Sequence, residues 1–498
     1  MAENQYQNAS EFQLKKCVIS KGDGSQPTSL LSGDMIIAFS FHESVFHPFV
    51  GASLMLSDSN GLINTFPIQG GEIVEIEVGT SLSEEPVNYK LKVYKIASRS
   101  IKDKRQLYTL VLASDEAFVN EVVRLQTLQE GRPDQIVANL IRKELKSSKE
   151  VFVEPTKFEV RMLAARRRPF DLIADLTKKS VSGSAVFTDK KKSNKAKKAY
   201  EKNREKNRRT DAEQEIKGTA GYLFWETKRG FNFYSIDALC SVPKKDKEGN
   251  VISGSEDFPA KDLLSEPWGP YEEVVANKDD GKDQRGIVSD FGFSSEVDIL
   301  TSLRKGKYAS LMVFFNISTG QYEEYTYKIS QSYDHMSHLG GQESVSLIPT
   351  NQEELSETPS RIMSAILDHE AWFNEPEIGD PADTKAENPN KFADWVKYFA
   401  SQSTARYDLL KTQEATFTIP GNPLICAGDK VDIRIPNKLS DQEKIEQPFD
   451  EETSGVYLVK EVSHLYDKLK GGNGNMKTKL KLFRDSYGMK DKETTHGG

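Results

Sequence analysis

The fold is decided by the stretch Glu72-Ile73-Val74-Glu75-Ile76-Glu77-Val78, in which Val74, Ile76 and Val78 alternate with Glu75 and Glu77. Because successive side chains of a strand point to opposite faces, this pattern predicts an antiparallel strand with one buried face and one face in water. The segments 89–95 and 106–112 alternate in the same way. With turn residues at 58–61 and 70–71, they predict that residues 1–115 form a first small β-barrel or sandwich.

The pattern becomes helical after Ser114, which suits a helix N-cap. Apolar residues recur at helical spacing in 115–125, 133–146 and the segment that begins at Arg168-Pro169-Phe170. The segments 222–227 and 231–236 then predict a β-hairpin across Lys228-Arg229-Gly230. Residues 116–285 are therefore predicted to form a mixed α/β middle domain.

This middle domain contains two stretches without a strong periodic pattern. Residues 190–217 are of low complexity, and the part from Lys190 to Arg209 holds eleven basic residues and only two acidic ones. We interpret this insertion as a solvated loop, while the alternative is an electrostatic contact to nucleic acid or to an acidic partner. Residues 240–283 are rich in Lys, Asp, Glu, Gly and Pro, and we interpret them as a long connection.

A second β block follows the middle domain. Residues 286–330 are predicted to start a second β-barrel, with strands at 308–317 and 322–329. Residues 331–412 form a helical and irregular excursion with helices at 359–370 and 392–410. Residues 413–488 supply the rest of the barrel, and 489–498 form a flexible tail. The strands expected in that last β block are 415–419, 430–435, 455–462 and 476–484. The predicted fold class is thus α+β, with two antiparallel β-barrels flanking a helical or mixed middle region that carries long insertions.

Composition excludes several classes of protein. The chain has 498 residues, enough for three or four domains of about 100–200 residues each. Hydrophobic residues are 37%, and no segment has the roughly 18 consecutive apolar residues of a membrane helix. The first ten residues are polar, which argues against a secretory signal. Only Cys17, Cys240 and Cys426 are present, which fits a reducing compartment and excludes a four-cysteine zinc site.

The histidines and cysteines do not form a recognisable chemical motif. His335 and His338 are three residues apart beside Asp334, which would make half a metal site on a helix. The surrounding residues are typical of a loop, so we interpret these histidines as surface or partner contacts. His42 and His47 are interpreted as loop or barrel-rim residues. No neighbouring motif activates any of the three cysteines, so we interpret them as structural.

Catalytic motifs are also missing from the sequence. It contains no phosphate-binding loop, no dinucleotide-binding glycine motif and no Gly-x-Ser-x-Gly nucleophile. The adjacent carboxylates Glu323-Glu324 and Glu353-Glu354 do not indicate an acid/base pair, which needs two different environments across a cleft. We therefore predict no enzymatic activity and no catalytic, metal or cofactor-binding residue. The sequence identifies no interface residue.

Two regions carry motifs that resemble those of a known family. The first runs from Phe291-Gly292-Phe293-Ser294-Ser295-Glu296-Val297-Asp298-Ile299-Leu300 into Gly306-Lys307-Tyr308-Ala309-Ser310-Leu311. The second contains Arg406 and Leu409, then 417–423, 427–431, 454–459, 462–464 and 482–486. This order resembles the baseplate hub proteins of contractile-tailed phages and the hub part of type VI secretion spikes. Within the second region, Gly455 is expected to permit a close backbone approach, and His464 to face a sheet neighbour rather than a metal.

The resemblance implies a structural virion protein with two tube-protein-like barrels. In that family, a homotrimer presents six similar barrels in a ring, which joins the hexameric tail tube to the trimeric central spike and leaves a channel for DNA. The implied partners are the spike, the tail-tube proteins and other baseplate proteins, with neither specific nucleic-acid binding nor membrane insertion. The implied location is the tail baseplate, after assembly in the host cytoplasm. Free strand edges suit a ring because they can pair with neighbouring chains.

Two alternatives stay open at this point. One is the hub of a type VI-like injection particle, although such hubs usually continue into their own spike and this chain ends soon after Gly488. The other belongs to a different class, a cell-wall hydrolase of a tail, which clearing of a peptidoglycan zymogram would reveal.

Overall fold

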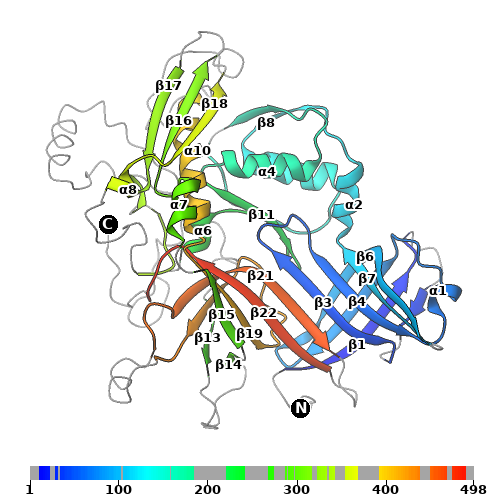
Figure 1. The fold of residues 1–498 in the computed structure, drawn as a ribbon. Coiled ribbons are helices and arrows are strands. Elements are labelled where there is room, and N and C mark those ends of the chain that lie inside the picture. The colour runs from blue at the N-terminus through cyan, green and yellow to red at the C-terminus, as the bar shows by residue number, and fades with distance from the viewer. Residues whose placement is uncertain are drawn as a thin grey trace.

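The structure is a computed structural model that describes residues 10–22, 28–31, 34–102, 105–157, 159–183, 220–241, 267–273, 287–288, 290–295, 298–316, 322–333, 336–341, 354–367, 392–437, 449–467 and 474–489. These residues are mostly β, and one 14-stranded sheet contains strands from both the N-terminal and the C-terminal parts of the chain. Figure 1 shows the arrangement of these strands. Among them, no helix is long and apolar enough to span a membrane. The basic insertion 190–217, most of the connection 240–283 and nearly all of the tail lie outside the described residues.

The N-terminal block is built from antiparallel strands and one short helix. These elements are β1 (Glu11–Ser20), β2 (Thr28–Leu30), β3 (Ile36–Ser44), β4 (Gly51–Asp58), α1 (Leu62–Thr65), β5 (Ile73–Thr80), β6 (Ser83–Lys102) and β7 (Arg105–Ala113). Along β5 the apolar side chains are buried, as the alternation predicts. On the outer face, Lys16 and Lys90 each lie 3.3 Å from Glu75, so that opposite charges pair across three strands.

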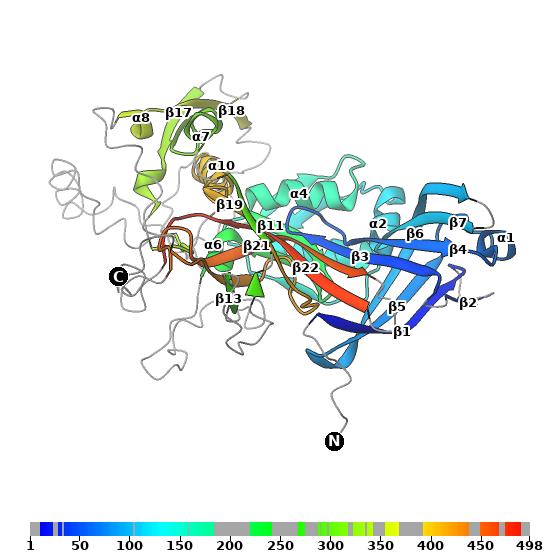
Figure 2. The same ribbon diagram turned by 60° about the horizontal axis from the view of Figure 1, so that its bottom comes forward.

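A C-terminal hairpin of β21 (Gly455–Asp467) and β22 (Gly474–Arg484) completes this block. β21 pairs with β3 from Glu461 to Asp467, and β22 pairs with β1 at Phe12. The strands β3, β4, β7, β6, β5, β1, β22 and β21 therefore form a closed circuit of paired strands. Figure 2 shows β1 and β22, from opposite ends of the chain, side by side. The first barrel predicted within residues 1–115 thus needs two strands from the C-terminus to close.

The same hairpin continues into a second sheet. Its other strands are β13 (Trp268–Glu273), β14 (Ile287–Val288), β15 (Asp290–Ser295), β19 (Gln413–Pro420) and β20 (Lys430–Arg434). The order is β14-β13-β20-β21-β22-β19-β15, and within the described residues β14 and β15 do not pair with each other. A closed second barrel therefore stays a prediction. β13 corrects the interpretation of 240–283 as a connection throughout, because it pairs with β20 in this sheet.

The middle region forms a layer of helices and small sheets. Its elements are α2 (Asp115–Val122), β8 (Leu128–Gly131), α3 (Pro133–Asn139) with a π-helical turn (Leu140–Glu144), β9 (Val151–Val153), β10 (Val160–Leu163), α4 (Pro169–Lys179), β11 (Tyr222–Thr227), β12 (Gly230–Ser235) and α6 (Ile236–Cys240). The hairpin predicted across Lys228 and Arg229 is confirmed. Every residue of β11 and β12 is buried, because one face packs on the second sheet and the other on the helices.

The remaining elements form an arm beside this layer. They are α7 (Ile299–Lys305), β16 (Ala309–Asn316), β17 (Tyr322–Lys328) with a 3-10 turn (Ile329–Gln331), α8 (Glu354–Glu357), β18 (Arg361–Leu367) and α10 (Phe392–Leu409). We call β16, β17 and β18 the arm sheet; among the described residues these strands pair only with one another. Two expectations were wrong here. In the described part of the chain, β16 and β17 do not pair with the second sheet. The helix expected at 359–370 is also wrong where the structure describes it, because Arg361–Leu367 is a strand whose parallel pairing with β16 overrides its ambiguous apolar pattern.

Candidate functional site

The hub-like motifs have a shared structural role, because charged residues from both motif regions meet in one buried place. Lys307 comes from the first motif region, Arg406 from α10, and Asp485 from the end of β22. Asp237 of α6 and His338, which follows the 3-10 turn (Ile329–Gln331) of the arm, complete the group. We call these five residues the junction cluster. It ties the arm, the middle layer and the second sheet together.

Local structure places these side chains. The Asp298 side chain accepts a 2.9 Å hydrogen bond from the Thr301 backbone and so caps the N-terminus of α7. Gly306 ends α7 with a φ of 76°, in the left-handed region that glycine adopts without strain. The chain then turns inward, and Lys307 Nζ donates to Thr412 Oγ1 at 2.8 Å. The aspartate and glycine of the motif are thus the two caps of a short helix.

Arg406 holds the centre of the junction cluster. It is fully buried, and its Nη1 lies 2.6 Å from Asp485 Oδ2. Its Nη2 lies 3.6 Å from Asp237 Oδ1 and also donates to the Ser337 carbonyl. Nδ1 of His338 lies 2.8 Å from Asp485 Oδ2, and its Nε2 lies 2.8 Å from the Tyr333 carbonyl oxygen.

Burial and ion pairing together set the pKa values of the charged groups in the junction cluster. Burial alone would raise the pKa of Asp485, but the adjacent His338 and Arg406 outweigh it and hold that pKa well below its usual range. Burial raises the pKa of Asp237, which Arg406 opposes. Burial lowers the pKa of Lys307 to about 8. The arrangement can fix chain segments against one another, and its buried charges are costly to separate.

A second group of charged residues joins the N-terminal block to the second sheet. It consists of Glu43, Arg229 and Asp429, and we call it the seam cluster. Glu43 on β3 accepts hydrogen bonds from the backbone amides of Lys228 at 2.7 Å and Ala427 at 2.9 Å. Arg229 binds both oxygens of Asp429, at 2.8 and 2.9 Å. Because Arg229 lies in the β11–β12 turn, this cluster attaches the middle layer to the N-terminal block and to the second sheet.

The seam cluster contains a feature that resembles a catalytic signal. Burial raises the pKa of Glu43 to about 7, against the effect of its two backbone hydrogen bonds. Such a value is typical of a general acid or base. However, Glu43 is only 2% exposed and both of its oxygens are already hydrogen-bonded. No substrate reaches it, so its role is structural. Across the described parts of the chain, no group of three or more potential metal ligands comes together.

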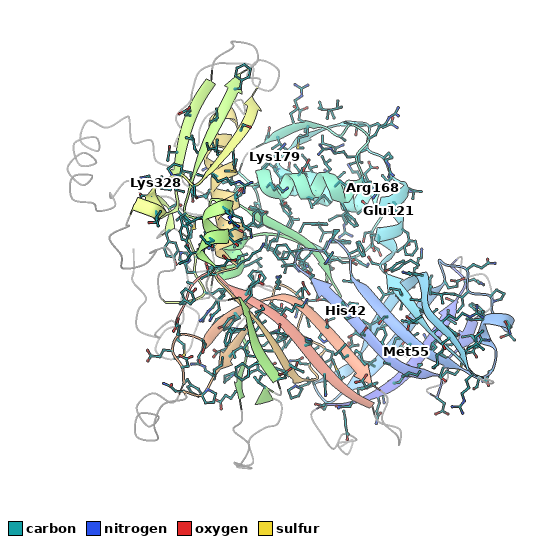
Figure 3. All side chains as sticks on the ribbon, in the orientation of Figure 1. His42, Met55, Glu121, Arg168, Lys179 and Lys328 are labelled. Carbon is teal, nitrogen blue, oxygen red and sulfur yellow. The ribbon has the colours of Figure 1, made fainter. Side chains whose placement is uncertain are left out.

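The histidines singled out in the sequence lie in different places. His338 is not a surface residue, since only 14% of its side chain is exposed; His335 lies outside the described residues. His42 lies within β3 rather than in a loop, and it hydrogen-bonds Ser463 across the seam with β21 (Figure 3). His47 lies in the turn after β3. His464 is confirmed as facing a sheet neighbour, because Thr478 of β22 is its hydrogen-bond partner.

The other singled-out residues have ordinary environments. All three cysteines are buried, and burial raises the pKa of Cys17 to about 12, which agrees with their structural interpretation. Gly455 begins β21 with a φ of 127°, and its closest neighbour is the Arg484 side chain rather than the backbone expected from the sequence. Glu324 lies exposed on β17, whereas Glu353 lies outside the described residues. The sequence analysis did not predict that the residues of the junction cluster come together. The charged residues within the otherwise apolar motifs were the signal that could have indicated it.

Replacing His464 with glutamine is expected to change how stability depends on pH. Burial lowers the pKa of His464 to about 3, below the ordinary value of 6.5. Between these values the unfolded chain binds a proton that the folded chain does not, so the folded state loses stability as pH falls from 6.5. The unfolding free energy of wild type minus that of His464→Gln should drop by about 1.4 kcal/mol per pH unit below 6.5. Urea titrations from pH 7.5 to 4.5 measure this difference.

The matched control for this experiment is His47→Gln, because His47 is exposed in a turn. Its difference from wild type should stay constant over the same pH range. The raised pKa of Glu43 changes the unfolding free energy with pH in the opposite direction. Glu43 is present in every variant, so its contribution cancels in the difference between two variants. Parallel stability curves for wild type and His464→Gln would contradict the prediction.

Known proteins offer similarity of structure but not of sequence. No family model matches the chain, and no curated protein is similar to it. The chain is similar to a tail protein from Neisseria meningitidis MC58, with 9% identity, a TM-score of 0.47 and coverage of 94% of this chain and 96% of that one. It is also similar to the 43 kDa tail protein of prophage MuSo2 from Shewanella oneidensis, with 11% identity and a TM-score of 0.45. This match covers 95% of this chain and 99% of that one.

A third similar structure is an Escherichia coli component of the type VI secretion system, itself described as similar to tail proteins of bacteriophage T4. It shares 8% identity with this chain at a TM-score of 0.38, with 96% of this chain and 79% of that one covered. Two of these three structures are thus phage tail or prophage tail proteins, and the third is a type VI secretion protein.

Proposed function

We propose that the chain is a non-enzymatic hub of a phage-type tail baseplate. Three copies form a ring that joins the hexameric tail tube to a trimeric spike and leaves a channel for DNA. In this role each chain contributes two barrel-like units, so that three chains match six tube subunits. The protein is then a virion component that assembles in the host cytoplasm, with the spike, the tube proteins and other baseplate proteins as partners.

The observation that carries the proposal is the shared C-terminal hairpin. β21 and β22 pair with β3 and β1 of the first unit, and with β20 and β19 of the second. The two units are therefore locked side by side at a fixed angle within one continuous sheet. An adaptor between rings of different symmetry needs such a rigid pair, because a flexible linker would not hold the six positions.

Two further features support the proposal. The residues that carry the hub resemblance are structural: they cap α7 and build the junction cluster, so their pattern specifies an architecture rather than a reaction. The second sheet also ends in β15, whose outer edge has no partner strand among the described residues. Such an edge can pair with a neighbouring chain.

Light scattering coupled to size-exclusion chromatography tests the proposal. We expect a mass of three chains of 56.0 kDa, with dissociation on dilution, and a ring with six lobes in negative-stain images. A single-chain mass at every concentration, or a stable dimer or tetramer, would contradict the ring. Clearing of a peptidoglycan zymogram would contradict the non-enzymatic role and favour the hydrolase alternative.

A further inference from the structure

The arm consists of an outer part and of the helix that carries it. We call α7, residues 306–308 and the arm sheet the outer arm; it contacts α10 through α7, β16 and β17. In Figure 2, α7 and the arm sheet lie beyond α10, on the side away from the 14-stranded sheet. A small apolar cluster holds the two parts together, in which Tyr308 and Tyr327 of the outer arm meet Ala405 and Leu409 of α10.

Within itself, the outer arm is well hydrogen-bonded. β16 is paired on both of its edges, with β17 and with β18. Ser360, just before β18, donates from Oγ to the Leu303 carbonyl at 2.6 Å, and Arg361 donates from Nη1 to the Lys305 carbonyl at 3.0 Å. Because these bonds attach α7 to the arm sheet, the outer arm is able to move as one body.

The polar contact between the outer arm and α10 is poorly satisfied on the side of Lys307. This residue is 4% exposed, and its ammonium group donates to the Thr412 hydroxyl at 2.8 Å. It forms no ion pair with any residue that the structure describes. An ammonium group offers three protons for hydrogen bonds, so a single neutral partner leaves most of the cost of burying this charge uncompensated.

Asp408 and Ser401 add unpartnered oxygen atoms on the side of α10. Oδ1 of Asp408 lies 3.5 Å from Lys305 Nζ, but its Oδ2 is buried and has no hydrogen-bond partner among the described residues. Oγ of Ser401 is buried without a partner there as well, and Ser401 lies one turn before Ala405 on the same side of α10. Water would satisfy these atoms if the contact opened, so their burial opposes docking of the outer arm.

The loop at 336–341, which leaves the arm after β17, is attached in a different way. The backbone amide of Leu339 donates to Asp485 Oδ1 at 2.9 Å, and that of Gly340 donates to Ser486 Oγ at 2.7 Å. These bonds hold the loop at the end of β22 and involve no residue of the outer arm. The loop is therefore a fixed point next to a weakly held body.

We propose that the outer arm undocks from α10 as one body in the folded protein, while the loop at 336–341 stays in place. In the undocked state Lys307, Asp408 and Ser401 are hydrated, and the hydrogen bonds inside the outer arm are kept. The two states are close in free energy because the small apolar cluster is opposed by these three poorly partnered groups. The motion belongs to the single chain, so the inference goes beyond the proposed function and does not depend on it.

Thiol labelling of the full chain under native conditions tests the proposal. Ala405 is fully buried between α10 and the outer arm, so the thiol introduced by Ala405→Cys reacts with a maleimide only when the outer arm has undocked. The native Cys17, Cys240 and Cys426 are buried elsewhere and report opening of the rest of the protein. We expect the introduced thiol to react roughly 100-fold faster than these three, or more.

The matched control on the same helix is Ser403→Cys. Ser403 is 3% exposed and lies on the opposite side of α10, against Gly221 of the middle layer. The thiol introduced there should react as slowly as the native ones. This control separates undocking of the outer arm from detachment of α10 itself.

Removing the buried charge should favour the docked state. Lys307→Met, added to Ala405→Cys, should slow the labelling about 10-fold or more, because methionine keeps the volume and needs no hydrogen-bond partner. Lys305→Met is the control for this substitution. Lys305 is 45% exposed, so its loss should change the labelling rate by less than about 5-fold.

Three results would overturn the proposal. Labelling at Ala405→Cys as slow as at the native cysteines would mean that the outer arm does not undock on its own. Equal labelling at Ala405→Cys and Ser403→Cys would mean that α10 itself detaches. Faster labelling with Lys307→Met would mean that the buried ammonium group holds the outer arm in place. Constant labelling rates of the native cysteines across the variants distinguish all three results from a general loss of structure.

Discussion

Replacing Arg406 with methionine is expected to lower the free energy of unfolding by about 3–5 kcal/mol. Methionine fills a similar volume, but it leaves Asp237 and Asp485 buried without their central cation. The loss is large because two buried carboxylates lose one shared partner, whereas an exposed ion pair contributes little. Urea unfolding followed by circular dichroism measures the change, with the linear extrapolation applied to both proteins.

The control for this variant is Arg168→Met. Arg168 pairs with Glu121 at 3.1 Å, but its side chain is 40% exposed. Figure 3 shows both residues at the edge of the middle layer. Its loss should cost less than about 1 kcal/mol. Equal effects of the two substitutions would mean that the junction cluster does not hold the arm to the second sheet.

The second large effect is expected from a fragment of residues 1–115 alone. This fragment contains six of the strands in the closed circuit but lacks β21 and β22, so the edges of β1 and β3 are left open. It also loses Tyr466 and Met476 from its core, together with the 2.7 Å hydrogen bond between Tyr89 and Tyr466. Each lost core side chain costs about 2–5 kcal/mol, so the two together are comparable to the net stability of about 5–15 kcal/mol of a typical domain. We expect no cooperative thermal unfolding transition.

Adding the missing hairpin should rescue the fragment. In this fusion, residues 460–481 follow residue 115 through a flexible Gly/Ser linker, and a cooperative transition should appear. The matched control is the same fusion with Tyr466→Ser and Met476→Ser, which keeps the strands but removes their core side chains. A cooperative transition in the fragment without the hairpin would show that the N-terminal block closes by other means.

The local elements of this fold could be predicted from the sequence because they depend on local patterns. The alternation at 72–78 gave β5, and the turn residues Lys228 and Arg229 marked the β11–β12 hairpin. α10 was expected at 392–410 and is found at Phe392–Leu409. In each case the period of the apolar residues matches the element that forms.

The pairings between distant segments could not be predicted in this way. Nothing in the alternation of β22 indicates that most of it pairs with β19 and that its first two residues pair with β1. β18 was misjudged because its apolar run fits a helix or a strand equally well, and only its neighbour β16 decides. The junction cluster was missed for the same reason: Asp237 and Asp485 are far apart in the sequence, and only the fold brings both to Arg406.

The shared hairpin also sets the order of events on the ribosome. β1 to β7 emerge early, but the strands that complete their circuit are translated last. At about 5–20 residues per second, the roughly 340 residues between β7 and β21 take about 20–70 seconds to synthesise. During that interval the nascent N-terminal block keeps two open strand edges, on β1 and β3, exposed to other chains. A circular permutant in which the hairpin is translated immediately before β1 removes this delay and should therefore aggregate less during synthesis.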